Sequence, residues 1–130
     1  MASIFSKIIN KEIPSYTILE NKNFISFLDI NPLTLGHCLV VPKKEIDYLF
    51  DLDDVFLNEI LIFSKKISSS LIRTVNCNRV GVSVIGLEVP HAHVHLIPIN
   101  NEKDMNFSNK RIEMSSEDFA DLQSRIIKNL

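Results

Sequence analysis

Apolar residues of this chain repeat with helical spacing in three segments and with strand spacing in five. The first helical segment is capped by Ser3 and ended by Pro14. The second begins at Asp53 or Asp54 and runs to about Ser70, and the third follows a capping-box sequence and covers about 116–130. The residues expected on the apolar faces of these helices are Ile4, Phe5, Ile8 and Ile9, then Val55, Phe56, Ile60, Phe63 and Ile67, then Phe119, Leu122, Ile126 and Leu130.

The strand-spaced segments are residues 16–20, 24–30, 37–41, 78–85 and 91–99. In the segment 24–30, Phe24, Ser26 and Leu28 are expected on one face and Ile25, Phe27 and Asp29 on the other. The polar stretch from residue 100 to 111 predicts a mobile loop. Because the strands come in consecutive runs instead of alternating regularly with helices, the pattern predicts an α+β fold with a mainly antiparallel sheet.

Length and composition exclude several classes of protein. A chain of 130 residues fits one domain, residues 1–130. A formal net charge of −2 excludes a basic domain that holds a nucleic-acid polymer by charge alone. No segment approaches the roughly 20 apolar residues of a membrane span, and the N-terminal sequence lacks the pattern of a signal peptide. We therefore expect a cytoplasmic protein with no membrane partner, and reduced thiols at Cys38 and Cys77.

The candidate chemistry lies in the run His91-Ala92-His93-Val94-His95, which holds three of the four histidines. On a strand, spacing by two would place the three imidazoles on one solvent-accessible face and the intervening apolar residues on a packed face. A neutral imidazole is a nucleophile and a charged one is a proton donor. Such a row can attack a phosphorus atom with one ring and hold its oxygens or the leaving group with the others.

A metal site is one alternative for these histidines. Two of them at positions i and i+2 of a strand can bind one zinc or copper ion, and His37 could complete such a site. The first and third histidines would lie about 13 Å apart along a strand, which is too far for easy sharing of one ion. The interpretation without a metal is therefore preferred, and no cofactor is expected.

The histidine run resembles the signature of the histidine triad (HIT) superfamily, His-φ-His-φ-His-φ-φ, where φ is apolar. The segments IFSKIINKEIP, FLDINP and GHCLVVPKK are also similar to the family, so the resemblance covers roughly residues 3–99. It implies a five-stranded antiparallel sheet with a long helix and shorter terminal helices. It also implies a homodimer with a continuous ten-stranded sheet. The expected ligand is a purine nucleotide, such as AMP or an adenosine phosphoramidate, cleaved at its α-phosphorus.

The resemblance also implies roles for single residues. His93 would be the nucleophile that forms a covalent nucleotidyl–histidine intermediate, while His91 and His95 orient it and contact the phosphate or leaving group. His37 matches an additional histidine beside the triad, and Asp29 matches the acceptor for the ribose hydroxyls. The residues implied for nucleotide binding besides Asp29 are Gly86 near the phosphate and Ile4, Phe5, Ile8, Phe27, Ile30 and Leu39 around the base. Core packing explains Phe27, Ile30 and Leu39 equally well.

Several positions depart from the family pattern. Leu87 and Glu88 stand where many members have glutamine and serine, and a carboxylate beside phosphate is unfavourable unless it points away or is protonated. Ser3 and Ser6 stand where many bacterial members carry a zinc-binding Cys-x-x-Cys, so no metal is predicted. The nucleoside phosphoramidase branch fits best. Two alternatives stay open, a non-catalytic nucleotide-binding regulatory dimer and a metal-binding protein.

Overall fold

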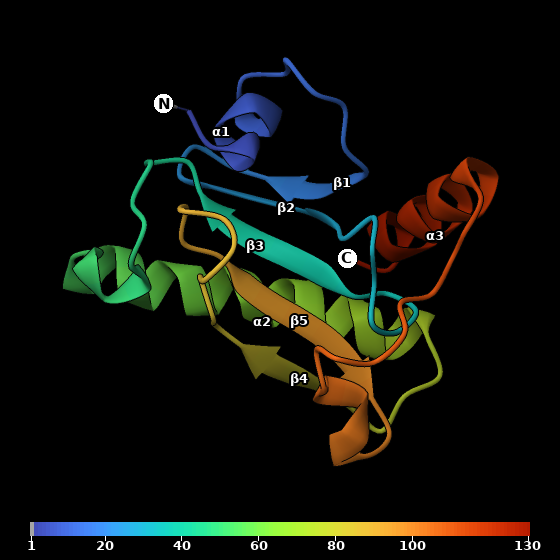
Figure 1. Ribbon diagram of the computed structural model, residues 1–130. Helices are drawn as coiled ribbons and strands as arrows, with labels where there is room; N and C mark the ends of the chain where they lie inside the picture. The colour runs from blue at the N-terminus through green and yellow to red at the C-terminus, as the bar shows by residue number, and fades with distance from the viewer. Residues whose placement is uncertain (1) are drawn as a thin grey trace.

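The computed structural model describes residues 2–130, which form one five-stranded antiparallel sheet packed against helices (Figure 1). Neighbouring strands follow the order β1-β2-β3-β5-β4. The elements are α1 (Ile4–Ile9), β1 (Thr17–Glu20), β2 (Phe24–Leu28), β3 (Cys38–Pro42), the 3₁₀ helix η1 (Leu49–Asp51), α2 (Asp54–Thr74), β4 (Arg79–Ser83), β5 (Val94–Ile99), the 3₁₀ helix η2 (Glu102–Met105) and α3 (Ser116–Lys128). The predicted α+β class and five-stranded antiparallel sheet are confirmed.

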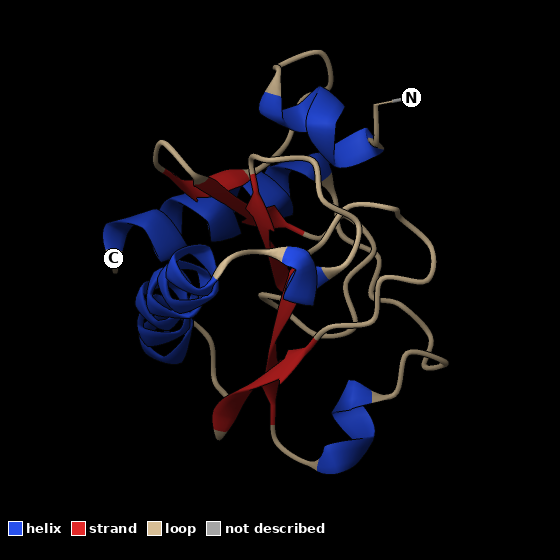
Figure 2. Ribbon diagram, turned by 90° about the vertical axis from the view of Figure 1, so that its left-hand side faces the viewer, coloured by secondary structure: helices blue, strands red, loops and turns tan. Residues whose placement is uncertain are grey.

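The two faces of the sheet have different environments because side chains alternate along each strand. Phe24 and Leu28 of β2 join the large apolar cluster that packs against α2 and α3. Ile25 and Phe27 join a smaller cluster that includes residues of α1. Figure 2 shows α2 and α3 on one side of the sheet and most of the long loops on the other. The face that carries the loops is the one available to a ligand.

Helix α2 is longer than the sequence pattern predicts. The side chain of Asp53 caps its first turn by accepting a hydrogen bond from Phe56 N–H, and the helix continues past Ser70 to Thr74. The helix does bury Ile60, Phe63 and Ile67 against the sheet, but Val55 was predicted to point inward and is exposed. Val55 lies in the first turn, where the neighbouring Phe56 is the residue that contacts the sheet, through the ring of Phe24. No helix in residues 2–130 combines the length and apolar character that a membrane span requires.

The histidine segment corrects the predicted strand boundaries. The last strand begins at Val94, not at His91, because the preceding backbone follows a different path: His91 N–H donates to Val89 carbonyl and Ala92 N–H to Ile46 carbonyl. Only His95 of the three histidines therefore lies in β5. The strand β4 is shorter than expected, and the polar stretch after residue 99 contains the helix η2.

The C-terminal helix begins where the sequence predicts. Ser115 accepts a hydrogen bond from Asp118 N–H at its N-terminus. Phe119, Leu122 and Ile126 are buried against the rest of the large cluster. Leu130 was expected to continue this stripe but lies beyond the end of the helix and is exposed.

Candidate active site

The three histidines of the run are buried, which corrects the prediction of a solvent-accessible face. The exposed fractions of His91, His93 and His95 are 0%, 7% and 8%. Val94 is buried in the opposite, large cluster, as the alternation predicts. The rings of His93 and His95 lie 4.9 Å apart between centroids in an edge-to-face arrangement. Of the three rings, only those of His93 and His95 keep some exposure to solvent.

Backbone carbonyls determine which nitrogens of His91 and His93 carry a proton. The Nδ1 atom of His93 lies 2.7 Å from the carbonyl oxygen of His91, which can only accept, so Nδ1–H donates and Nε2 holds a lone pair. The Nε2 atom of His91 lies 2.8 Å from the Pro42 carbonyl and donates to it in the same way. Nδ1 of His91 is therefore an acceptor, and the Ser3 hydroxyl lies 2.8 Å from it.

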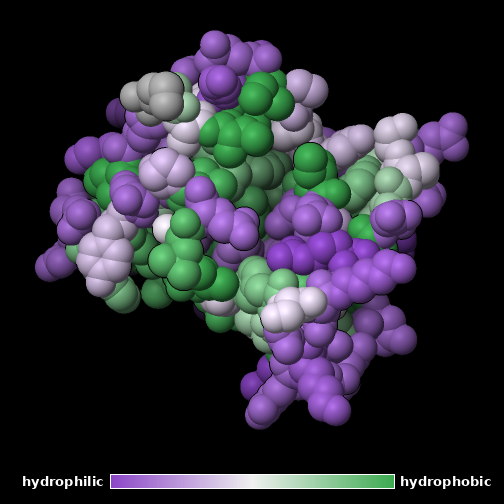
Figure 3. Space-filling view, in the orientation of Figure 1, coloured by the Kyte–Doolittle hydropathy of each residue, from purple (hydrophilic) through white to green (hydrophobic). Residues whose placement is uncertain are grey.

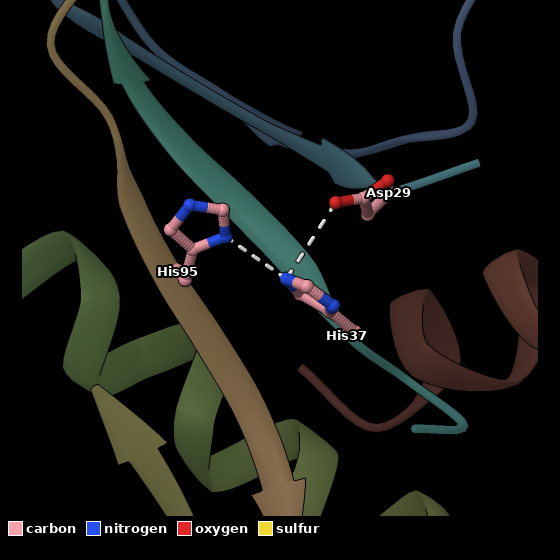
Figure 4. Close-up of side chains that lie close together, drawn as sticks. All are labelled: Asp29, His37 and His95. Atoms are coloured by element: carbon pink, nitrogen blue, oxygen red, sulfur yellow. Dashed lines mark hydrogen bonds and ion pairs between the residues drawn. The ribbon is translucent and has the colours of Figure 1, made fainter. Parts of the chain in front are cut away.

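A second series of hydrogen bonds determines which ring nitrogens of His37 and His95 carry a proton (Figure 4). The backbone N–H of Leu33 donates to Nδ1 of His37 over 3.0 Å, so this nitrogen has no proton. The proton of His37 is therefore on Nε2, which lies 3.0 Å from Nδ1 of His95 and donates to it. Nε2–H of His95 then remains as a donor. One ring of the site thus offers a lone pair, at His93, and its neighbour offers an N–H, at His95.

Burial keeps the rings of His37, His93 and His95 neutral at neutral pH. Desolvation lowers the pKa of His37 to about 3 and that of His95 to about 4, with a further decrease from neighbouring positive charge. Burial also lowers the pKa of His93, although the hydrogen bond to the His91 carbonyl and the charges of Asp29 and Glu88 oppose this shift. A neutral His93 at neutral pH is the form in which a histidine is nucleophilic.

Asp29 lies at the end of β2, next to the histidines. Its Oδ1 accepts a hydrogen bond of 2.8 Å from Asn31 N–H, and its Oδ2 lies 3.6 Å from Nε2 of His37. That distance is too long for a hydrogen bond, and the low pKa of His37 means that the contact is not an ion pair at neutral pH. Burial raises the pKa of Asp29. Oδ2 is thus a free acceptor at the edge of the site.

The group Asp29, His37 and His95 also has the composition of a metal site, since one donor atom from each lies within 4.8 Å of the others. The hydrogen bonds do not fit an ion. Leu33 N–H points at Nδ1 of His37 and so places the proton on Nε2, the nitrogen that would have to bind the metal. The donor pattern therefore favours a hydrogen-bonded relay, and the absence of a resident metal stays a prediction.

The residues predicted to line a base pocket divide into two groups. Phe5, Ile8, Phe27 and Leu39 pack together in the small apolar cluster, which contacts the histidines through the rings of Phe5 and His93, 5.0 Å apart. Figure 3 shows hydrophobic residues gathered below α1 on this face of the molecule. Ile4 and Ile30 are exposed, so neither belongs to this cluster. Gly86 has φ of 71°, the left-handed region that favours glycine, in the loop before the histidines.

The structure adds residues that the sequence pattern did not indicate. The ring of Phe107, after η2, lies 5.0 Å from that of His95 and covers the relay from outside. Arg111 fixes this segment by donating to the carbonyls of Asn31 and Phe107. Ser3, Ser6 and Glu45 form hydrogen bonds around His91. The aromatic residue in an otherwise polar stretch was the only available signal for Phe107.

A hollow of about 550 Å³ lies away from the histidines, between the β1–β2 turn and α2. Its walls include Phe24, Glu59, Ile62 and Lys66 but no histidine or cysteine. It has an apolar floor and charged edges, but none of the nucleophilic groups described above. We therefore place the candidate active site at the histidines.

An α+β protein with a row of hydrogen-bonded neutral imidazoles beside an apolar cluster is, by fold and site, a histidine triad protein. The comparison with known families agrees: the family model described as HIT domain matches residues 10–102, and the chain belongs to this family.

Related proteins extend the match over most of the chain. An uncharacterized HIT-like protein of Borreliella burgdorferi is 38% identical and covers 98% of this chain and 97% of its own length. The adenosine 5'-monophosphoramidase HNT1 of Saccharomyces cerevisiae is 39% identical over 78% of this chain and 65% of its own. The crystal structure of a hypothetical histidine triad nucleotide-binding protein from Sulfolobus tokodaii matches with a TM-score of 0.81 at 29% identity, covering 96% of this chain and 89% of that one.

The buried neutral rings predict a loss of stability in mild acid. An unfolded histidine has a pKa of about 6.5, so between pH 7 and 5 the unfolded chain binds protons at the positions of His37 and His95 while the folded protein does not. Stability must therefore fall as the pH falls through this window, by about 1–2 kcal/mol for each ring. Urea unfolding at pH 7 and pH 5 measures the difference.

The matched variant is His37→Asn, whose side-chain oxygen can still accept from Leu33 N–H but does not titrate. The variant should lose less stability than the wild type between the two pH values. Comparing the two proteins cancels the contributions of the other titrating groups. An equal loss in both would contradict the neutral state of His37.

Proposed function

We propose that this protein is a cytoplasmic nucleotide hydrolase that cleaves nucleoside phosphoramidates at the α-phosphorus through a covalent bond to His93. The main support is the pair of protonation states in the site, a lone pair on Nε2 of His93 and a donor N–H on Nε2 of His95. The similarity to a yeast adenosine 5'-monophosphoramidase supports the choice of substrate class.

In the first proposed step, Nε2 of His93 attacks the α-phosphorus, and the bond from phosphorus to the leaving nitrogen breaks. The electron pair of that bond goes to the nitrogen, which takes a proton from a water molecule and departs as an amine, while Nε2–H of His95 donates a hydrogen bond to a phosphate oxygen. The His93 ring becomes positively charged, and its Nδ1–H stays hydrogen-bonded to the His91 carbonyl. The bond from Nε2–H of His37 keeps the proton of neutral His95 on Nε2, the atom that donates to the phosphate.

In the second step, water attacks the phosphorus, and the bond between phosphorus and Nε2 of His93 breaks. The proton that the attacking water loses neutralises the hydroxide left by the first step, so the site regains its starting state and the products are an amine and a nucleoside monophosphate. A covalent intermediate divides one difficult displacement into two easier ones. No cofactor takes part in either step.

The nucleoside half of the substrate fits the neighbouring groups. The free Oδ2 of Asp29 accepts hydrogen bonds from the ribose hydroxyls, since a carboxylate oxygen is a natural acceptor for them. The apolar cluster of Phe5, Ile8, Phe27 and Leu39 packs against a purine base such as that of AMP. Ile4 and Ile30 remain candidates for the outer rim of this pocket because a bound base would cover exposed apolar side chains.

A non-catalytic nucleotide-binding regulator is the second candidate function. The observation that favours it is the charge of Glu88, an exposed residue whose carboxylate acts on both Asp29 and His93. A negative charge near the site opposes binding of a phosphate. Single-turnover trapping of a labelled nucleotide on the protein separates the two functions, because only the hydrolase forms the adduct.

His93→Ala should abolish turnover of adenosine phosphoramidate and leave AMP affinity nearly unchanged, because the pocket walls lie on other elements. Steady-state kinetics and calorimetric titration measure the two quantities. His95→Ala is the control within the triad: turnover should slow, but a labelled adduct should still form. Wild-type turnover by His93→Ala on every phosphoramidate tried would eliminate the covalent mechanism.

Asp29→Ala should weaken binding of AMP by about 1.5–3 kcal/mol, which is roughly 10- to 150-fold in affinity, because hydrogen bonds to a charged group are lost. The same substitution should have little effect on 2',3'-dideoxy-AMP, which lacks both hydroxyls. Calorimetric titration of both ligands against both proteins completes a thermodynamic cycle, which gives the coupling free energy between Asp29 and the two hydroxyls. Equal affinity of the wild type for the two nucleotides would remove Asp29 from ribose recognition.

We also propose that the protein is a homodimer joined through β4. Within residues 2–130 this strand pairs only with β5, so its other edge carries unpaired backbone groups. Val82, on this strand, is 56% exposed, and Val84 and Ile85, which follow it, are also exposed. Pairing of two such edges would continue the sheet to ten strands and cover these apolar side chains.

Val82→Asp should convert the dimer to a monomer, because it places a charge at the centre of the proposed interface. Sedimentation equilibrium of the pure protein measures the mass. Val55→Asp is the control, since Val55 is equally exposed but lies in the first turn of α2, where an acidic residue is tolerated. A monomeric wild type, or a dimeric Val82→Asp protein, would contradict this interface.

A further inference from the structure

A hydrogen-bonded cluster connects helix α1 to the histidines. The Ser3 hydroxyl is 2.8 Å from Nδ1 of His91, and the backbone N–H of Ser3 donates to Oε1 of Glu45 over 2.8 Å. The Ser6 hydroxyl donates to the same carboxylate oxygen over 2.9 Å. Ser3 and His91 are buried, whereas Glu45 lies at the surface. The cluster therefore extends from solvent to the inner end of the histidine run.

The Ser3 hydroxyl lies 2.8 Å from Nδ1 of His91 and 3.3 Å from the Ser6 hydroxyl, and the shorter contact is the one to His91. Because Nε2–H of His91 donates to the Pro42 carbonyl, Nδ1 must accept, and the Ser3 hydroxyl is its donor. The oxygen of that hydroxyl accepts in turn from Ser6 N–H over 3.0 Å. Replacing the hydroxyl would leave Nδ1 of a fully buried ring with only the Ser6 hydroxyl, which lies 3.5 Å away and already donates to Glu45, and a poorly bonded buried polar atom is unfavourable. The His91 ring would then gain by changing its tautomer or its orientation.

Two routes lead from the Ser3 hydroxyl to His93. The first passes through His91, whose side chain Ser3 holds and whose carbonyl oxygen accepts the Nδ1–H of His93. The second passes through α1, because Ser3 is its N-cap and the helix carries Phe5, whose ring contacts both His91 and His93. Both routes end at the ring whose Nε2 lone pair is the proposed nucleophile.

We infer that Ser3 is a positioning residue, which, supported by Glu45, holds the His91 ring in one tautomer and thereby orients His93 for attack. The Ser3 hydroxyl bonds to His91 and acts on His93, the proposed nucleophile, only through other residues. Its effect on turnover rests on the function proposed above, but its effect on the imidazoles does not. The two can therefore be measured separately.

The experiment compares the wild type with Ser3→Ala, Ser3→Thr and Ser115→Ala. Ser115 is the matched control, because it caps α3 through the same kind of hydrogen bond and lies away from the site. Nitrogen-15 NMR of the histidine rings reports the tautomers, and steady-state kinetics with adenosine phosphoramidate reports kcat and KM. Thermal unfolding reports the loss of each helix cap.

Ser3→Ala should shift the Nδ1 resonance of His91 and move the ring resonances of His93. It should also decrease kcat by up to about 100-fold, because small errors of position at the reacting atoms cost large factors in rate. Ser3→Thr keeps the hydroxyl and should restore both signals. Ser115→Ala should lower the unfolding temperature without changing either. Ring resonances and kcat that stay at wild-type values in a folded Ser3→Ala protein would overturn the inference.

Glu45→Ala tests the same cluster if Ser3→Ala does not fold. It removes the acceptor of the bonds from Ser3 and Ser6 at a surface position, and should produce a smaller shift of the same resonances. Glu45→Gln keeps an acceptor oxygen and should remain close to the wild type. Identical spectra for Glu45→Ala and Glu45→Gln would overturn the role of Glu45. A wild type that does not turn over, with ring shifts as expected, would contradict the proposed function and leave the positioning role supported.

Discussion

The hydrogen bond from Nδ1 of His93 to the carbonyl oxygen of His91 is the interaction on which the site depends. A backbone carbonyl accepts and never donates, so this single contact fixes both the tautomer of His93 and the direction of its lone pair. The segment that supplies this carbonyl lies outside the paired residues of β5. A regular strand would direct the His91 carbonyl into the sheet ladder, whereas here the backbone is held by Val89 and Ile46 and that carbonyl faces the ring of the next histidine.

Burial and tautomer control act together in the other rings. Desolvation alone would make His37 and His95 neutral but would leave either nitrogen free to hold the proton. The backbone N–H of Leu33 donates to Nδ1 of His37 and so places the proton of His37 on Nε2. That Nε2–H donates to Nδ1 of His95 and so places the proton of His95 on Nε2. Phe107 then shields the pair from water. One amide in the loop between β2 and β3 thus determines the donor that His95 offers at the far end of the relay.

The sequence predicted the fold well because its main signals are periodic. Alternation in residues 24–28 assigned Phe24 and Leu28 to one face of the sheet and Ile25 and Phe27 to the other, as the structure has them. The same reasoning failed at His91, because alternation describes a strand and cannot show that backbone bonds to Val89 and Ile46 delay its start. It also could not reveal that the histidines are buried, since their covers, Phe5 and Phe107, come from distant segments. Ser3 was interpreted as a helix cap, which the structure confirms, and both Ser3 and Ser6 as replacements of zinc-binding cysteines, but nothing in the sequence indicated that both lie in the cluster around His91.

Glu88 illustrates how one charge acts differently on two stages of the proposed reaction. Before attack, the carboxylates of Asp29 and Glu88 oppose the approach of a phosphate. The same two charges raise the pKa of His93 against the effect of burial, which means that they favour a positively charged ring. In the proposed intermediate this ring is positively charged, so both carboxylates stabilise it relative to the free site. A charged group accelerates a reaction when it stabilises the charge that develops on the attacking ring more than it stabilises the bound substrate. An acidic residue in place of serine is therefore compatible with turnover, at the cost of weaker substrate binding.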